Sequence, residues 1–315
     1  MSEQPIQTKP KPRKRLYLLL GILFLTVIAV LAYIEFSLSR PIGEGPAGPT
    51  VDASSFSDVW SEAKVQVIGV GDSVTAGLGA KSPSHTFFNR LLNNPSDEFA
   101  DMEGVCLSTV LPNLTSENFA ISGSESSVHA DVIVETIPDY EDAFGIVLMT
   151  SGGNDIIHSY GRSKPRECAM YSASLEQALP WIENFRTRLD KMFEDLTAKF
   201  PLGCEIYIGD IYDPTDGVGD APSVFLPHWP DGLAIHGKYN DVIRSVAGKY
   251  DHVHVVPLHA TFLGHGSHCR QFWRSAYHAE DPHYWFFTNI EDPNDRGYDA
   301  IRRVFLKTIV EKTSL

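Results

Sequence analysis

The pattern that most constrains the fold is an alternation of short apolar runs with longer segments of helical period, which fills residues 56–315. Five runs have the length and composition of strands that are covered on both faces, at residues 65–70, 118–121, 145–150, 205–209 and 253–257. Strands that alternate with helices imply a parallel sheet with right-handed crossovers. The sequence therefore predicts a three-layer α/β/α sandwich around a mostly parallel, five-stranded sheet.

Three helical segments are expected around these strands. The clearest carries apolar residues at steps of three and four over residues 175–200, and we expect this stripe to face the core. A second helix is predicted over about residues 231–249, and a last one after the sequence EDPND. In sheets of this kind, ligands bind beyond the carboxyl ends of the strands. The residues that directly follow each strand are therefore the place to look for chemistry.

An uncharged run over residues 16–34 separates a basic tail, residues 1–15, from the rest of the chain. A helix of this length, at about 1.5 Å per residue, nearly spans the roughly 30 Å hydrocarbon core of a bilayer. The run is longer than the apolar part of a usual signal peptide, and no A-x-A-like cleavage site follows it. We predict a signal-anchor helix over residues 16–38, with a cytoplasmic N-terminus and an extracytoplasmic body that is periplasmic or extracellular. A cleaved signal peptide is the alternative.

Residues 39–55 are rich in Pro, Gly and small polar residues and are expected to form a linker to a domain over 56–315. The formal net charge of the chain is −14, and the tail over residues 1–15 contributes five basic and one acidic residue, which leaves −18 for the remainder. Such an acidic body is a poor binder of nucleic acid. The predicted helix, not the surface of the body, would hold the protein at a membrane.

The four cysteines are widely spread and include no C-x-x-C motif; they are Cys106, Cys168, Cys204 and Cys269. In an extracytoplasmic compartment they could form up to two disulfides. Four cysteines allow three connectivities, and the sequence does not separate them.

The first strand leads into a glycine-rich turn that ends in Ser73. A dinucleotide-binding fingerprint would need a third glycine where Val74 stands, and a P-loop would need a lysine before Lys81. Both phosphate-binding interpretations fail on these residues. What remains is a serine directly after a buried strand.

The next two strand ends carry groups that suit acyl transfer. The second candidate strand leads to Gly123, which can offer a backbone N–H, and the third leads to Asn154, which can offer a side-chain N–H. In acyl transfer, negative charge develops on the former carbonyl oxygen, and fixed N–H donors stabilise it.

Taken in order, GDSVTAG with Ser73, NFAISG with Asn118 and Gly123, and GGND with Asn154 resemble the first three motif blocks of the GDSL or SGNH hydrolase superfamily. This resemblance covers roughly residues 64–310 and implies the SGNH-hydrolase, flavodoxin-like fold. It also implies a serine esterase or lipase with Ser73 as nucleophile. The Ser73 N–H, the Gly123 N–H and the Asn154 side chain would be the oxyanion donors. A serine mechanism requires no cofactor, and the substrate would be a small-molecule, lipid or acylated glycan ester.

The fourth block departs from the family pattern, which usually places Asp-x-x-His before the last helix, often followed by Pro-Asn and Gly-Tyr. Here EDPNDRGY supplies the later part, but Asp292 stands directly before the proline. We therefore expect the base to be His283, nine residues earlier, with residues 284–291 as an insertion. Asp281 and Glu280 are its candidate orienting carboxylates, and Asp281 is preferred for its residue type and its extended conformation before Pro.

Two other functions stay open at this point. His259, His265 and His268, with Cys269 beside them, form a plausible zinc set and would suit a metal-dependent hydrolase. A non-catalytic, glycan-binding relative of the same fold is the third possibility. The predicted function is a membrane-anchored, extracytoplasmic serine hydrolase that cleaves acyl-ester or O-acetyl groups.

Overall fold

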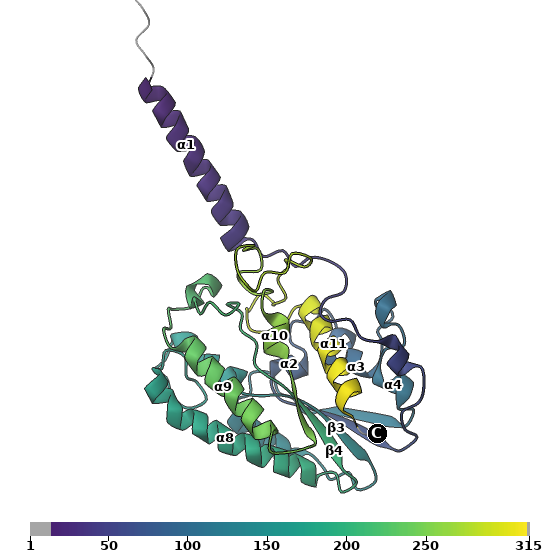
Figure 1. Cartoon of the computed structure of the whole chain (residues 1–315). Coiled ribbons are helices and arrows are strands. Elements are labelled where there is room, and N and C mark those ends of the chain that lie inside the picture. The colour runs from purple at the N-terminus through teal and green to yellow at the C-terminus, as the bar shows by residue number, and fades with distance from the viewer. Residues whose placement is uncertain (1–13, 314–315) are drawn as a thin grey trace, which may run out of the picture. The chain divides into compact units, whose positions relative to one another are not determined.

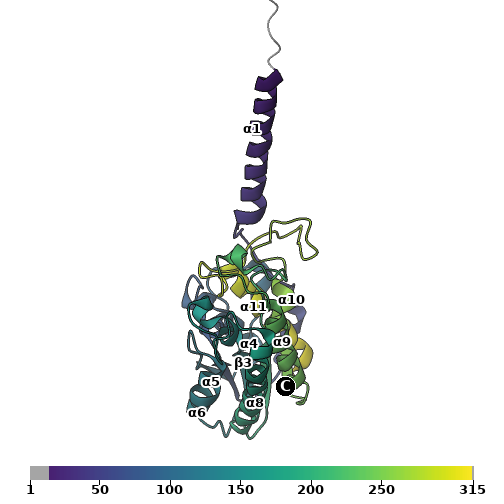
Figure 2. The ribbon, with the colours of Figure 1, turned by 90° about the vertical axis from the view of Figure 1, so that its left-hand side faces the viewer.

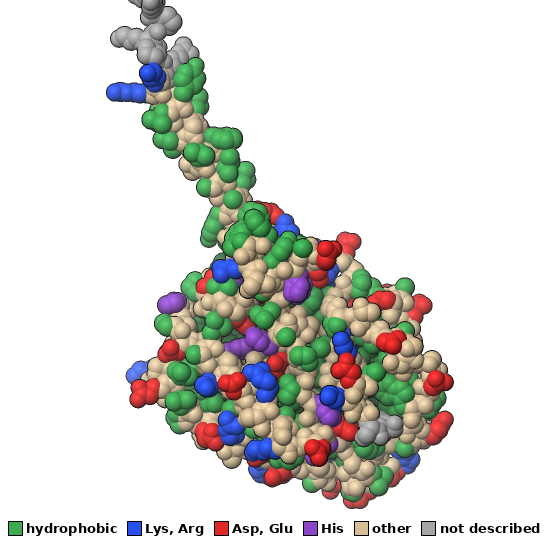
Figure 3. Space-filling model, viewed as in Figure 1, with side chains coloured by type: hydrophobic (Ala, Val, Ile, Leu, Met, Phe, Trp, Pro, Cys, Tyr) green, Lys and Arg blue, Asp and Glu red, His purple; other side chains and the backbone are tan. Residues whose placement is uncertain are grey.

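The computed structural model describes residues 14–313 and divides the chain into two compact units, one ending at Ser39 and one spanning Arg40–Leu315 (Figure 1). The first unit consists of α1 (Lys14–Tyr33), which continues into the π-helix η1 (Ile34–Leu38). An 18-residue window within this 25-residue stretch has a mean hydropathy of 2.6, so the stretch is long and apolar enough to cross a membrane by length and composition. Figure 3 shows apolar side chains along it and basic ones at its N-terminal end. The predicted basic tail lies outside the described residues up to residue 13.

The second unit is built on a five-stranded sheet in the order β2-β1-β3-β4-β5, in which all neighbours are parallel. The strands are β1 (Val65–Val70), β2 (Leu114–Asn118), β3 (Phe144–Thr150), β4 (Cys204–Gly209) and β5 (Val253–Val256). Four predicted strands match closely. The second was wrong in position, because β2 ends at Asn118, where the predicted run begins. Its sequence LTSEN lies at the sheet edge and is mostly exposed, so it carries no apolar signal.

Helices connect successive strands, and two more follow the last strand. They are α2 (Ser73–Ala76), α3 (Phe87–Leu92), α4 (Leu107–Val110), α5 (Ser126–Val128), α6 (Val134–Thr136), α7 (Gly153–Ile157), α8 (Leu175–Ala198), α9 (Gly232–Ala247), α10 (Leu258–Phe262) and α11 (Asp295–Lys312). The three predicted helices correspond to α8, α9 and α11. α8 begins with a capping box, in which the side chains of Ser174 and Gln177 each accept a hydrogen bond from the other's backbone N–H. In α11 the Asn294 side chain accepts from the first two backbone N–H groups that follow Asp295.

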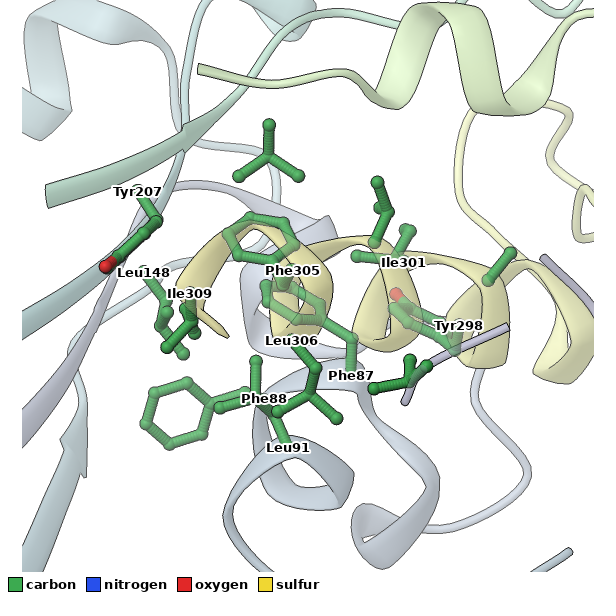
Figure 4. Close-up of a cluster of buried hydrophobic side chains, with 14 of the residues drawn as sticks. Phe87, Phe88, Leu91, Leu148, Tyr207, Tyr298, Ile301, Phe305, Leu306 and Ile309 are labelled. Carbon is green, nitrogen blue, oxygen red and sulfur yellow. The ribbon is translucent and has the colours of Figure 1, made fainter. Parts of the chain in front are cut away.

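The helices bury both faces of the sheet, which makes three layers (Figures 1 and 2). Side chains alternate along each strand, so Val67 joins the cluster under α3, α4, α10 and α11, while Ile68 joins the cluster under α6, α8 and α9. Figure 4 shows part of the first cluster, where side chains of α3 and α11 pack against each other. There the rings of Phe87 and Phe305 stack with centroids 5.0 Å apart. The predicted fold class is confirmed.

The sequence suggested a linker over residues 39–55, and all of it except Ser39 belongs to the second unit. The Ala47 N–H donates to Asp299 of α11 at 3.0 Å, and the Arg296 guanidinium donates to the carbonyl oxygens of Glu44 and Pro46. Val51 is buried. This segment is therefore packed against the last helix rather than being a free tether.

The four cysteines are all buried free thiols in the structure. None of the disulfides that the sequence allowed is formed among them.

Candidate active site

The strand order reverses between β1 and β3, and in doubly wound sheets ligands bind at this kind of switch point. Ser73 follows β1 there as the first residue of α2. The carboxylate of Asp72 accepts hydrogen bonds from the Val74 N–H at 3.1 Å and from the Thr150 hydroxyl at 2.8 Å. Gly71 has φ +142°, and a Cβ added to it would lie 2.3 Å from the Thr150 carbonyl oxygen. Only glycine therefore lets the turn before the serine approach β3 this closely.

The loops after β2 and β3 join this turn. The Gly71 carbonyl oxygen accepts from the Ile121 N–H at 2.9 Å and from the Ser124 hydroxyl at 3.2 Å. The Asn154 side chain donates to the Ser124 carbonyl oxygen at 2.9 Å. Gly123, between Ile121 and Ser124, has φ +79° and open space where a Cβ would be. The three expected motif blocks thus meet at the ends of β1, β2 and β3.

A buried histidine, His129, links the loops that follow β2 and β3. The ring nitrogens of His129 are hydrogen-bonded to the hydroxyls of Ser124 and Ser151, each at 2.8 Å. Burial lowers the pKa of His129 to about 3, so its imidazole is neutral. It holds two strand ends together and carries no charge at the site.

The charged neighbour of Ser73 is Asp292, whose side chain is fully buried. Burial raises the pKa of Asp292, while hydrogen bonding from the Ser73 hydroxyl and from the Asn289 amide opposes that rise. Asn289 Nδ2 donates to Asp292 Oδ2 at 2.5 Å. Oδ1 of Asp292 has no hydrogen bond of normal geometry to any of the described residues. One oxygen of this buried carboxylate is therefore unpaired within the described part of the chain.

The segment predicted as an insertion, residues 284–291, folds back on the residues before α11. The Phe287 N–H donates to the Asp292 carbonyl oxygen at 2.7 Å, and the Asn294 N–H donates to the Trp285 carbonyl oxygen at 2.9 Å. These two hydrogen bonds fix the backbone of Asp292 against the segment over residues 284–291. His283 lies four residues before Phe287, and four extended residues reach up to roughly 13 Å. The chain is therefore long enough to place His283 well away from Asp292.

The structure places His283 at a different location from Ser73. Its Nδ1 lies 2.5 Å from Asp281 Oδ1, and the other oxygen of Asp281 pairs with Arg296 at 2.6 Å. Its ring lies against the backbone of Gly43, where an added Cβ would be 2.6 Å away. Glu280 is exposed. The expected base and its carboxylate partner are thus together, but they pack against the segment that precedes the domain rather than the serine.

Asp292 is the residue that the sequence prediction passed over. Counted from the Pro-Asn that follows it, Asp292 stands where the family pattern has histidine, and Asn289 stands three residues earlier, where the pattern has aspartate. The spacing was therefore a usable signal. The residue types concealed it, since an aspartate is not the expected base.

The histidines considered as a zinc set have separate partners. The His265 ring stacks on Trp285 with centroids 3.4 Å apart, and His268 is hydrogen-bonded to Asp220 at 2.8 Å. His259 faces His236, with ring centroids 5.0 Å apart. Within residues 14–313, no group of three or more His, Cys, Asp or Glu side chains is arranged to hold a metal ion.

Ser73 and Asn154 both line a pocket that encloses about 1070 Å³ of space, its open mouth included. Its wall is largely apolar and includes Ile156, Ile211, Val224, Leu226, Trp229 and Leu233. Glu291 also lines it, and Tyr160 donates a hydrogen bond to this carboxylate. His283 is not among the lining residues. Asp292 is not among them either, so the serine hydroxyl and the Asn154 amide border the apolar chamber while the Asp292 carboxylate lies outside its lining.

The model of the GDSL-like Lipase/Acylhydrolase family matches residues 70–300, which is most of the chain. The chain belongs to this family. The family predicted from the motif blocks is confirmed, and the protein is a GDSL-type ester hydrolase.

Solved structures of the same fold include a phospholipase A1 from Streptomyces albidoflavus NA297, which is 18% identical with a TM-score of 0.50. That match covers 80% of this chain and 100% of the other. The extracellular lipase from Streptomyces rimosus is 16% identical, with a TM-score of 0.49 and coverage of 79% and 100%. An acetylxylan esterase from Geobacillus stearothermophilus is 16% identical, with a TM-score of 0.46 and coverage of 79% and 96%. No curated protein matches this GDSL-family chain by sequence.

Proposed function

We propose that this GDSL-type hydrolase cleaves carboxylic esters with Ser73 as the nucleophile and with Asp292, in place of a histidine, as the acceptor of its proton. The observation that carries the proposal is the serine hydroxyl beside a fully buried carboxylate whose pKa is raised and whose Oδ1 has no hydrogen-bond partner among the described residues. A carboxylate of ordinary pKa is a weak base near neutral pH. Burial makes this one more basic, which favours proton transfer from the attacking hydroxyl.

In the proposed mechanism, the Ser73 oxygen attacks the ester carbonyl and its proton passes to Asp292. The backbone N–H groups of Ser73 and Gly123 and the side-chain N–H of Asn154 stabilise the oxyanion. Collapse of the intermediate releases the alcohol, which takes the proton from Asp292. Water then attacks the acyl-enzyme by the same route and releases the acid. Asn289 orients the base, because its hydrogen bond to Oδ2 turns Oδ1 of Asp292 toward the serine.

The hydrolase is proposed to be anchored in a membrane by the helix over Lys14–Leu38, with its N-terminus in the cytoplasm and the domain on the opposite side. The supporting observations are the length and hydropathy of this helix and the basic residues that precede it. A thiol-reactive reagent that does not cross membranes tests the orientation, since the native cysteines are buried. A cysteine introduced at the exposed residue Leu202 should react from outside intact cells, and reaction only after lysis would contradict this orientation.

The acyl group is proposed to occupy the apolar pocket beside Ser73, which suits a hydrocarbon chain better than an acetyl group alone. The test is fluorophosphonate labelling of the full chain, followed by hydrolysis of p-nitrophenyl esters of graded chain length. Labelling that is lost in Ser73→Ala, with an optimum above acetate, is the expected result. Activity that is abolished by a chelator and independent of Ser73 would favour a metal-dependent hydrolase. Retention on acylated glycan without hydrolysis would favour a binding protein.

A further inference from the structure

A loop at the wall of the pocket holds a phenylalanine out into solvent. Val224 and Leu226 line the pocket, whereas the side chain of Phe225 between them is 80% exposed. The backbone of Phe225 is in the left-handed region, with φ +63° and ψ +22°. This conformation is strained for a bulky residue and persists only where the surrounding structure imposes it. The fold therefore keeps this ring outside while its two neighbours face the pocket.

The same loop is tied to the start of the domain. Arg40 donates a hydrogen bond to the Ser223 carbonyl oxygen, and its guanidinium lies 5.4 Å from the centre of the Phe225 ring. Only Ser39 separates Arg40 from Leu38, the end of the apolar helix. Two peptide units span at most about 7.6 Å. If the helix crosses a bilayer, the chain itself keeps this loop close to the membrane surface.

We propose that Phe225, together with Ile42, is seated in the surface of the lipid bilayer, and that the loop over residues 221–226 is the lip through which an acyl chain enters the pocket from the membrane. Ile42 is 52% exposed and follows Arg40 by two residues, so it is a second exposed apolar side chain close in sequence to the residue that binds this loop. Aromatic rings are favoured at the membrane–water interface. The substrate class is then a lipid ester that resides in the bilayer, and this part rests on the proposed ester hydrolysis.

The position of the lip is tested with the full chain in phosphatidylcholine nanodiscs. Phe225→Cys carries an environment-sensitive fluorophore, and labelling is selective because the four native cysteines are buried. Leu202→Cys is the control, since Leu202 is 62% exposed and lies just before the amino end of β4, whereas the loop over residues 221–226 follows the carboxyl end of the same strand. Spin-labelled lipid should quench the probe at 225 and leave the probe at 202 unaffected. Equal quenching at both positions, or a blue-shifted probe at 225 that lipid does not quench, would overturn the proposal. The second outcome would indicate that protein covers the loop.

The entry route is tested by activity. Phe225→Ser should lower the ratio of p-nitrophenyl palmitate hydrolysis in nanodiscs to p-nitrophenyl butyrate hydrolysis in solution by about tenfold, whereas Leu202→Ser should not. An unchanged ratio in an active enzyme would refute entry through the lip. If the unsubstituted protein hydrolyses neither ester, the proposed function fails, and the quenching experiment still decides where Phe225 lies.

Discussion

The Asn289 amide donates to Asp292 Oδ2 at 2.5 Å, the Ser73 hydroxyl interacts with the same carboxylate, and Asp292 Oδ1 has no hydrogen-bond partner of normal geometry among the described residues. In the usual family pattern a carboxylate orients an imidazole base. Here an amide at the first position orients a carboxylate at the second. In the proposed mechanism a third group still orients the base, but the base is a carboxylate rather than an imidazole.

The first prediction identifies the base. Ser73→Ala and Asp292→Asn should each lower kcat by about 10³-fold or more, with little further loss in the double variant, because the two residues act as one unit. His283→Ala should retain most of the activity, since His283 pairs with Asp281 near Gly43. Steady-state hydrolysis of p-nitrophenyl butyrate measures all four proteins. A loss in His283→Ala as large as that in Ser73→Ala, with both variants folded, would restore His283 as the base.

The second prediction concerns pH. Asp292 accepts a proton only when it is ionised, so kcat/KM should fall as pH falls through its pKa, which burial raises above the ordinary 3.8. In Asp292→His the midpoint should move toward about 6.5, the ordinary pKa of histidine. Adding Asn289→Asp would restore the Asp-x-x-His pattern and should raise activity further at neutral pH. The measurement is a pH profile with an ester that does not ionise, and identical midpoints before and after Asp292→His would count against Asp292 as base.

Much of the fold could be predicted because β1, β3, β4 and β5 are covered on both faces and so appear as apolar runs. The edge strand β2 could not, because only one of its sides is paired and its polar side chains are exposed. The packing of residues 40–55 against the last helix was also not predictable. The Pro and Gly content of this segment indicates turns, but the hydrogen bonds that Arg296 makes to Glu44 and Pro46 depend on a helix about 250 residues away.

Within the site, the motif blocks predicted which three strand ends converge. They did not predict the charged partner of the serine. That partner depends on how residues 284–291 fold back, and the pairing of Phe287 with Asp292 is a tertiary arrangement without a periodic signal in the sequence. Under the proposed function, spacing relative to the last helix points to Asp292, whereas residue type points to His283.

The third prediction concerns the two glycines of the serine junction. Gly71→Ala should abolish activity and lower stability, because its Cβ would lie 2.3 Å from the Thr150 carbonyl oxygen in β3. Gly123→Ala is the matched control, since Gly123 also has positive φ but has no atom within 4 Å of the added Cβ. It should lose only about 1 kcal/mol of stability from backbone strain. Thermal unfolding and ester hydrolysis of the two variants provide the comparison, and equal losses in both would contradict the steric explanation.

The fourth prediction concerns how stability depends on the ionisation of Asp72, the buried residue directly before Ser73. Burial raises its pKa from 3.8 to about 6, so the folded protein binds this proton more tightly than the unfolded chain does. The stability that this group contributes is present below pH 4 and is lost as pH rises through about 6, with a total change of roughly 3 kcal/mol. The unfolding free energy of the unsubstituted protein should therefore fall relative to Asp72→Asn between pH 4 and 7. A difference that stays constant, or that grows in favour of the unsubstituted protein, would show that Asp72 ionises normally in the fold.

The last prediction concerns the length of the acyl chain. Leu233 lines the pocket from α9 and is only half-buried, so Leu233→Trp can add its larger ring to the chamber without displacing the buried core of that helix. Filling this space should leave room for an acetyl group at Ser73 and obstruct a longer chain. We expect hydrolysis of p-nitrophenyl decanoate to fall about tenfold or more relative to p-nitrophenyl acetate. Leu202→Trp, which lies before the amino end of β4 and away from the pocket, should leave the ratio unchanged. A shift toward longer chains in Leu233→Trp would mean that the acyl group binds outside this pocket and that the apolar chamber holds the alcohol side of the ester instead.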